Sequence, residues 1–215
     1  MPRRRPGRGR WGRRLLTVVG ICCVVAGILV IAIPLLGVWQ RSRADNRALR
    51  DWSGGGSQAL VGAAPDSAGG HPALPVCGAA SAPPDDYALV SFPGLPQYGY
   101  AQVAGDGTWD MLTQRSMVHY ATSAAPGQTG NSIVAFHREA EFEHIDQLAR
   151  GMTITVQDRA CHVWNYRVTS SVTVAPKDAE PFLTPTTGKE LTLITCSPWY
   201  VDTQRIVWRA ELVEG

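Results

Sequence analysis

The stretch Leu191-Thr-Leu-Ile-Thr-Cys196 alternates apolar and β-branched side chains and ends on a cysteine. Such alternation over a short run is typical of a β-strand. A strand fixes its last residue in place, and the loop that follows leaves that residue accessible. Cys196 is therefore well placed to act as a nucleophile, provided that a nearby cation or base favours its thiolate. A buried structural thiol is the alternative that this stretch alone leaves open.

Two more predicted strands carry groups that would complete such a site. The stretch Ser132-Ile-Val-Ala-Phe-His137 ends on a histidine, and Arg205-Ile-Val-Trp-Arg-Ala-Glu-Leu212 begins with an arginine. A thiol, an imidazole and a guanidinium would supply a nucleophile, a proton-transfer group and an oxyanion stabiliser. Arg209 competes with Arg205 for the last role, because it lies four residues along the same strand and on the same face.

The order of these groups resembles that of the sortases, the cysteine transpeptidases of Gram-positive cell surfaces. The shared pattern is a histidine, then T-L-x-T-C ending on Cys196, then an arginine. The terminal run R-I-V-x-R-A-E-L is similar to that of actinobacterial class E sortases in particular. Over residues 83–215 the resemblance extends to shorter motifs: Val118-His-Tyr120, Ala125-Pro-Gly127 with Gly130-Asn131, His137-Arg138 and Leu148-Ala-Arg-Gly151.

The resemblance implies a reaction and its partners. Cys196 would cleave the Thr–Gly bond of a C-terminal sorting signal like L-P-x-T-G or L-A-x-T-G and form an acyl-enzyme. His137 would protonate the leaving amine, and Arg205 would hold the oxyanion or the substrate backbone. The expected partners are secreted proteins that carry the signal, with a peptidoglycan precursor or pilin amine as acceptor. No cofactor is expected.

From residue 85 onward, the chain consists mainly of short segments typical of β-strands, which Gly and Pro separate. The predicted strands cover residues 87–92, 98–103, 132–136, 152–156, 161–174, 191–195 and 205–212, with short helices near 109–114 and 143–148. Many short strands in one domain favour a barrel or a sandwich, which periodicity does not separate. The resemblance implies an eight-stranded, mainly β barrel with one or two short helices, preceded by an N-terminal transmembrane helix.

Residues 15–39 contain no charged side chain and are long enough to span a bilayer. Seven arginines precede them, whereas the arginines that follow are diluted by Asp45 and Asp51. The positive-inside rule then predicts a single-pass protein of the cell membrane with a cytoplasmic N-terminus and an extracellular catalytic domain. Beside such an apolar run, the arginines indicate a membrane flank rather than a nucleic-acid partner. The predicted divisions are a cytoplasmic tail (1–14), a transmembrane helix (15–39), a tether (40–84) and a catalytic domain (85–215).

The predicted tether is rich in Gly, Ala, Ser and Pro over residues 52–84, a composition typical of a flexible linker. It would hold the catalytic domain away from the membrane. Of the five cysteines, Cys22 and Cys23 lie in the membrane segment. If Cys196 stays reduced as the nucleophile, Cys77 and Cys161 can pair and pin the end of the tether to the barrel. Two unpaired thiols are the alternative.

The remaining candidates concern the substrate groove. His119 and Tyr120 of the H-Y motif and Trp199 of the loop after the cysteine are candidate groove residues, with a structural role as the alternative for His119. Phe136 departs from the sortase pattern, in which glycine usually precedes the histidine, so its ring is expected to narrow the groove or shift His137. Arg138 should point to the opposite face and form a structural ion pair.

Two rival functions are also compatible with the sequence. One is an extracytoplasmic cysteine hydrolase that acts on cell-wall peptides, in which water replaces the amine. The L,D-transpeptidases are disfavoured because Leu-Ile-Thr precedes Cys196 where their motif has S-H-G. The other rival is a non-catalytic surface-binding module on a membrane anchor. The sequence shows no C-x-x-C or His/Cys cluster that indicates a metal site.

Overall fold

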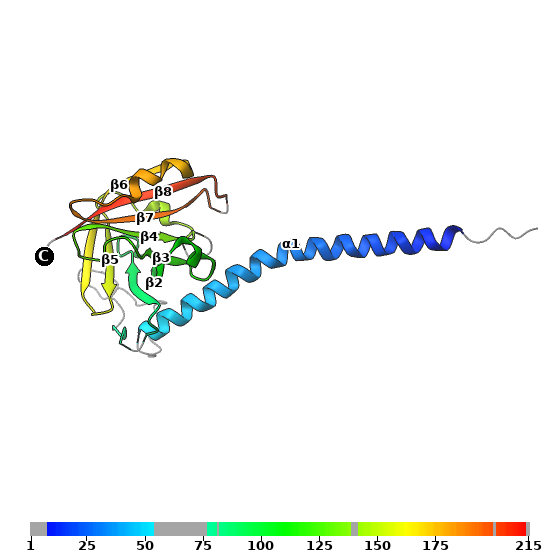
Figure 1. The fold of residues 1–215 in the computed structure, drawn as a ribbon, viewed down its shortest axis with the longest axis horizontal. Coiled ribbons are helices and arrows are strands. Elements are labelled where there is room, and N and C mark those ends of the chain that lie inside the picture. The colour runs from blue at the N-terminus through cyan, green and yellow to red at the C-terminus, as the bar shows by residue number, and fades with distance from the viewer. Residues whose placement is uncertain (1–7, 54–76, 81, 139–141, 200, 214–215) are drawn as a thin grey trace, which may run out of the picture. The chain divides into compact units, whose positions relative to one another are not determined.

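The computed structural model describes residues 8–53, 77–80, 82–138, 142–199 and 201–213. Within these residues, eight strands close into a barrel in the order β1-β2-β3-β4-β7-β8-β6-β5 (Figure 1). The eight-stranded barrel predicted from the sequence is therefore confirmed. The strands are β1 (Asp86–Ser91), β2 (Ala101–Gly107), β3 (Met117–Tyr120), β4 (Gly130–Phe136), β5 (Thr153–Asp158), β6 (Val163–Val174), β7 (Lys189–Ser197) and β8 (Gln204–Leu212).

The barrel is mixed, because β2 pairs parallel with β3 and β4 pairs parallel with β7. A parallel pair needs a crossover connection. The connection from β4 to β7 contains β5, β6 and the short helices η2 (Ile145–Gln147), η3 (Pro176–Asp178) and η4 (Glu180–Leu183). It therefore brings His137 and Cys196, which lie far apart in the sequence, to the ends of neighbouring strands.

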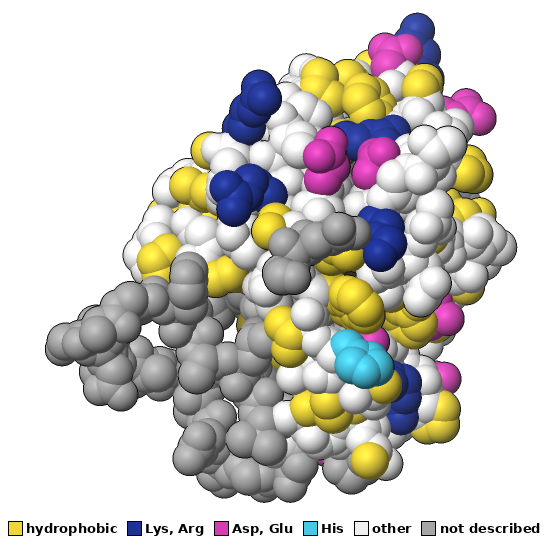
Figure 2. Space-filling view, turned by 90° about the vertical axis from the view of Figure 1, so that its left-hand side faces the viewer, with side chains coloured by type: hydrophobic (Ala, Val, Ile, Leu, Met, Phe, Trp, Pro, Cys, Tyr) yellow, Lys and Arg dark blue, Asp and Glu magenta, His cyan; other side chains and the backbone are white. Residues whose placement is uncertain are grey.

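The interior of the barrel is filled by apolar and aromatic side chains from alternate strand positions. The largest include Trp208, Tyr166, Phe92 and Phe142, each buried almost completely. On the surface in Figure 2, basic and acidic side chains lie interspersed among hydrophobic ones. The apolar residues on alternate positions explain why the strands could be located from the sequence.

Most predicted strands match the structure to within a few residues, but β3 was missed. It is only four residues long and both Met117 and Val118 are buried, so it shows no alternation of apolar and polar side chains. The strand predicted at residue 98 begins at Ala101, because Tyr98 lies in a turn in which its amide donates to the Leu95 carbonyl. The two predicted helices are the 3-10 helices η1 (Trp109–Thr113) and η2.

The helix α1 spans Arg8–Trp52 and includes the predicted transmembrane segment. Among the described residues it is the one helix that is long and apolar enough to cross a membrane. It continues well beyond the predicted end at Trp39, and the segment from Arg41 onward belongs to the same compact unit as the barrel. The structure thus differs from the predicted tether over residues 40–52.

The end of α1 is anchored on the outside of the barrel. Trp52 is fully buried and packs in a cluster with Ala48, Leu89 and Val103. Its indole Nε1 donates to the side-chain oxygen of Gln157 at 2.9 Å. A large aromatic side chain is rarely buried unless its surroundings fit it and its polar atom has a partner. Residues 41–52 are therefore a docked part of the barrel unit.

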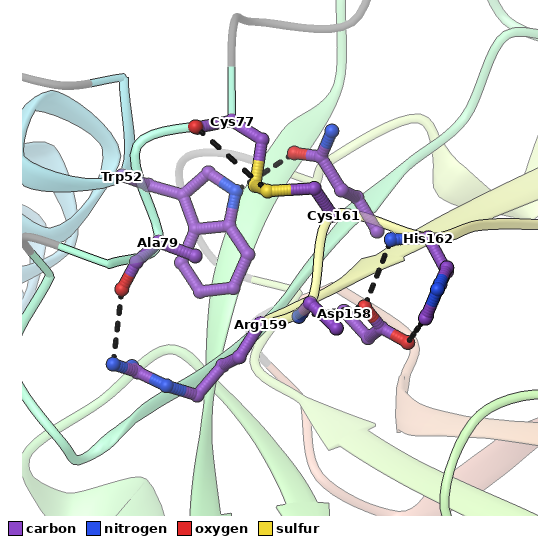
Figure 3. Close-up of a disulfide and its surroundings, with 9 residues drawn as sticks. Trp52, Cys77, Ala79, Asp158, Arg159, Cys161 and His162 are labelled. Carbon is purple, nitrogen blue, oxygen red and sulfur yellow. Dashed lines mark hydrogen bonds and ion pairs between the residues drawn. A yellow bond between two sulfur atoms is a disulfide. The ribbon is translucent and has the colours of Figure 1, made fainter.

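A short strap, residues 77–80 with 82–85, returns the chain to the same place. Cys77 and Cys161 form a disulfide there (Figure 3). The Gly78 amide donates to the Trp52 carbonyl at 2.5 Å. Arg159 donates to the carbonyls of Ala79 and Ala82 at 3.0 and 3.2 Å, as well as to two later carbonyls. The strap and the end of α1 thus form one clamp on the barrel; residues 54–76 of the predicted tether lie outside the described residues.

Removal of the Cys77–Cys161 bridge should destabilise the protein. The bridge closes a loop with a sequence separation of 84 residues, and disulfides over long loops typically contribute about 2–4 kcal/mol. We expect the free energy of unfolding of the double variant Cys77→Ser with Cys161→Ser to be lower by that amount. Denaturant titration measures this difference. Non-reducing peptide mapping should find this pair in the unaltered protein. A bridge that contains Cys196 instead would contradict the pairing and the nucleophile together.

Candidate active site

His137, Cys196 and Arg205 lie in one row across three neighbouring strands. Phe136 of β4 is level with Thr195 of β7, so His137, the next residue, is level with Cys196. Cys196 is in turn the direct partner of Arg205 in β8. Because paired strands lie about 4.8 Å apart, the register brings all three residues into one neighbourhood.

The three side chains also share the outer face of the barrel. Two residues before Cys196 and two after Arg205 lie Ile194 and Val207, which pack outside the barrel with Ala135. Phe136, between Ala135 and His137, and Ile206, between Arg205 and Val207, belong to the interior cluster of the barrel. Since side chains alternate along a strand, His137, Cys196 and Arg205 follow the outer set. Next to the three residues lies this outer apolar cluster, against which Leu112, Phe182 and Leu183 pack.

The imidazole of His137 is held by a backbone carbonyl. Its Nε2 lies 2.8 Å from the carbonyl oxygen of Leu112, at the end of η1. A carbonyl oxygen only accepts hydrogen bonds, so Nε2 carries the hydrogen. In the neutral ring, Nδ1 then holds the lone pair. The Leu112 carbonyl thus fixes both the tautomer and the orientation of the ring, as a proton-transfer group requires.

Cys196 is half-buried and keeps its thiol, since the disulfide joins Cys77 to Cys161. The residue before it, Thr195, is buried, and its hydroxyl donates to the Phe136 carbonyl at 2.6 Å. This bond ties β4 to β7 directly beneath the row. It thereby fixes the register that brings His137 level with Cys196.

The two candidate arginines have different surroundings. Arg205 forms an ion pair with Asp202 of the β7–β8 loop and donates to the Gln204 carbonyl at 3.0 Å. Arg209 pairs with Glu190 at 2.7 Å and donates to the Phe182 carbonyl at 3.2 Å. Arg205 lies in the row with Cys196, whereas Arg209 ties η4 to the barrel. Sequence reasoning missed Asp202, for which the spacing D-x-x-R was the available signal.

His119 does not line the outer face beside Cys196. It is 2% exposed, and its ring stacks on Tyr87 with centroids 4.3 Å apart. Its Nδ1 lies 2.8 Å from a carboxylate oxygen of Asp106, and its Nε2 lies 3.0 Å from the Ala124 carbonyl. Burial and the Asp106 charge raise the pKa of the Tyr87 hydroxyl to about 12, so Tyr87 stays neutral beside the ring. The structure thus gives His119 the structural role.

The other two groove candidates are more accessible. Tyr120 stacks on Trp109 with centroids 4.6 Å apart, and Trp109 is itself exposed. Trp199 is exposed in the loop that follows Cys196. Of the two, Trp199 is the nearer to Cys196 along the chain.

Phe136 does not share the outer face with His137. Phe136 points into the barrel, where it packs against Phe142 and Trp208. Because His137 is the next residue, its side chain leaves from the other face and the Phe136 ring cannot narrow the groove. Arg138 is buried and pairs with Asp146 at 2.9 Å, which agrees with the structural ion pair expected for it.

Comparisons with known proteins agree with this geometry. A family model described as the sortase domain matches residues 94–213, more than half of the chain. A sortase D5 transpeptidase from Clostridium perfringens is 26% identical with a TM-score of 0.53, and the match covers 60% of this chain and 80% of that one. A variant of sortase E from Streptomyces avermitilis is also 26% identical, with a TM-score of 0.51 and coverage of 60% and 89%.

Sortase A from Corynebacterium diphtheriae gives a similar result, with 25% identity, a TM-score of 0.54 and coverage of 62% of this chain and 63% of that one. No curated protein matches the chain. Because the family model covers most of the barrel and the fold agrees, the chain belongs to the sortase family of cysteine transpeptidases.

Proposed function

We propose that this protein is a membrane-anchored sortase of the class E type. In this proposal Cys196 cleaves the Thr–Gly bond of an L-A-x-T-G or L-P-x-T-G signal and transfers the acyl group to a cell-wall or pilin amine. The observation that carries it is the strand register, which aligns His137, Cys196 and Arg205 on one outer face. The terminal R-I-V-x-R-A-E-L run supports the class, and sortases of other classes show similar identity.

The reaction can be written through these three residues. The Cys196 thiolate attacks the threonine carbonyl carbon, and the carbonyl electrons move to an oxyanion that Arg205 stabilises. As the C–N bond breaks, protonated His137 gives its proton to the departing glycine amine, which leaves a thioester. The incoming amine attacks the thioester, loses a proton to His137, and releases Cys196. Since Nε2 is bound to the Leu112 carbonyl, Nδ1 is the nitrogen that exchanges this proton.

Product analysis with the full-length protein tests the proposal. A peptide that contains L-A-x-T-G or L-P-x-T-G is incubated with and without an amine acceptor, and the products are identified by mass spectrometry. We expect a Thr–acceptor amide when the amine is present, with faster transfer from L-A-x-T-G if the class is E. Release of a free threonine carboxylate at the same rate with or without amine would favour the hydrolase instead.

The apolar helix supports a membrane anchor with the barrel outside the cell. The arginine-rich tail before residue 15 is denser in positive charge than the segment after residue 39, and positive flanks stay in the cytoplasm. We expect protease added to intact protoplasts to digest the barrel and leave the N-terminal tail protected. An epitope tag at each end would report both results. A barrel that survives until the membrane is permeabilised would reverse the orientation.

A further inference from the structure

We propose that Asp45, at the docked end of α1, is a positioning residue for His137. The inference rests on the proposed function of His137 in proton transfer. It assigns a role in positioning His137 to Asp45 alone among the residues of the segment that follows the apolar span, which lies outside the sortase domain match that begins at residue 94.

A chain of hydrogen bonds joins Asp45 to the histidine. Asp45 is 2% exposed, and its Oδ1 accepts from the backbone amide of Ser116 at 3.3 Å. The carbonyl of the same residue, Ser116, accepts from the backbone amide of His137 at 2.8 Å. Ser116 thus connects the two residues: its amide is bound to the Asp45 carboxylate, and its carbonyl is bound to the backbone amide of His137.

The ring of His137 depends on the same segment. Ser116 ends the connection from β2 to β3, which contains η1 and therefore Leu112. The Leu112 carbonyl accepts from the His137 Nε2–H at 2.8 Å. The adjacent Arg115 is fixed by an ion pair with the buried Asp86. A displacement of the 109–116 segment would therefore move both the backbone and the ring contacts of His137.

Asp45 reaches Ser116 because α1 is docked. Asp45, Ala48 and Trp52 are spaced three and four residues apart, so they lie on one side of the helix, and all three are buried. Ala48 and Trp52 pack against the barrel, and the strap secures Trp52 through the Gly78 amide. A carboxylate on a buried face costs free energy unless it is hydrogen-bonded. The Ser116 amide supplies such a hydrogen bond to Oδ1 of Asp45.

The test compares three variants of the full-length protein in detergent micelles. Asp45→Ala removes the acceptor, while Asp45→Asn keeps a side-chain oxygen that can accept from the Ser116 amide. Trp52→Phe is the matched control. It removes a hydrogen bond from the same buried face of the helix, but that bond is to Gln157 and is not connected to His137. For each variant kcat and KM for peptide transfer, the melting temperature and the ¹⁵N spectrum of the histidine rings are measured.

We expect Asp45→Ala to lower kcat about tenfold with KM for the peptide unchanged; a displacement of 1 Å at a reacting group can cost ~10²-fold. Asp45→Asn should recover most of the rate. Trp52→Phe should lower the melting temperature and leave kcat unchanged. The His137 ring signals should shift in Asp45→Ala and not in the control.

Three results would overturn the proposal. The first is a kcat for Asp45→Ala equal to that of the unaltered protein. The second is a loss of kcat shared by Trp52→Phe at equal folded fraction. The third is an unchanged His137 ring spectrum in Asp45→Ala. If the unaltered protein forms no acyl-enzyme, the proposed function fails, and the ring spectra alone decide whether Asp45 positions His137.

Discussion

Cys196→Ala should abolish formation of the acyl-enzyme on a peptide that contains L-A-x-T-G or L-P-x-T-G. A methyl group cannot attack the carbonyl, and His137 and Arg205 act only on a bond that the thiolate has begun to form. The measurement is mass spectrometry of the intact protein after incubation with peptide. The unaltered protein should gain the mass of the acyl fragment, and the variant should gain none.

Cys22→Ala combined with Cys23→Ala is the matched control for thiol loss. These two cysteines lie on the exposed surface of α1, within the apolar span. The control should form the adduct and transfer it as the unaltered protein does. Transfer that persists in Cys196→Ala would remove the nucleophile from the proposal, and with it the role of the strand register.

Most strands, and the three candidate residues at their ends, could be predicted because the signals are local. The strands β4, β7 and β8 are runs of β-branched and apolar residues, and each candidate stands at the end of its run. The parallel pairing of β4 with β7 depends on a long crossover, which periodicity does not reveal. The resemblance to sortases implied an eight-stranded barrel, and the structure supplies the parallel pairing itself.

Other parts of the site left no local signal. The Leu112 carbonyl that orients His137 is a backbone group, so its role depends on where the loop folds and not on its side chain. The direction of Phe136 also required the structure, because a bulky ring before a histidine fits either face of a strand. Once Phe136 is in the barrel interior, alternation places His137 outside.

The docked end of α1 shows a different limit. The predicted tether includes residues 40–52, although its Gly, Ala, Ser and Pro content is concentrated in residues 52–84. The helix nevertheless buries Asp45, Ala48 and Trp52, whose spacing is that of one helix face. Three residues among many polar ones make a weak pattern in the sequence. The pattern could be interpreted only once the structure showed the surface of β1 and β2 on which this face packs, with Leu89 and Val103.

Arg205 should be needed for the rate of the first chemical step. Loss of a charged or hydrogen-bonding oxyanion stabiliser costs ~10²–10³-fold in comparable enzymes, and we expect that loss in kcat for Arg205→Ala. Arg205→Lys should recover little, because one ammonium cannot reproduce the forked donors of a guanidinium. The measurement is the rate of acyl-enzyme formation in a single turnover, at equal folded fraction.

Arg209→Ala is the control, because it removes the same side chain from the same strand and face. Arg209 is bound to Glu190 and to the Phe182 carbonyl, so its loss should lower stability with little effect on the rate. Arg205 pairs instead with Asp202, whose side chain is 68% exposed. An exposed pair contributes only about 0–1 kcal/mol, so a substrate oxyanion can replace the Asp202 carboxylate at Arg205 with little penalty. If the Arg209 variant is slower than the Arg205 variant, Arg209 is the oxyanion stabiliser. The assignment of Arg205 from the strand register would then be wrong.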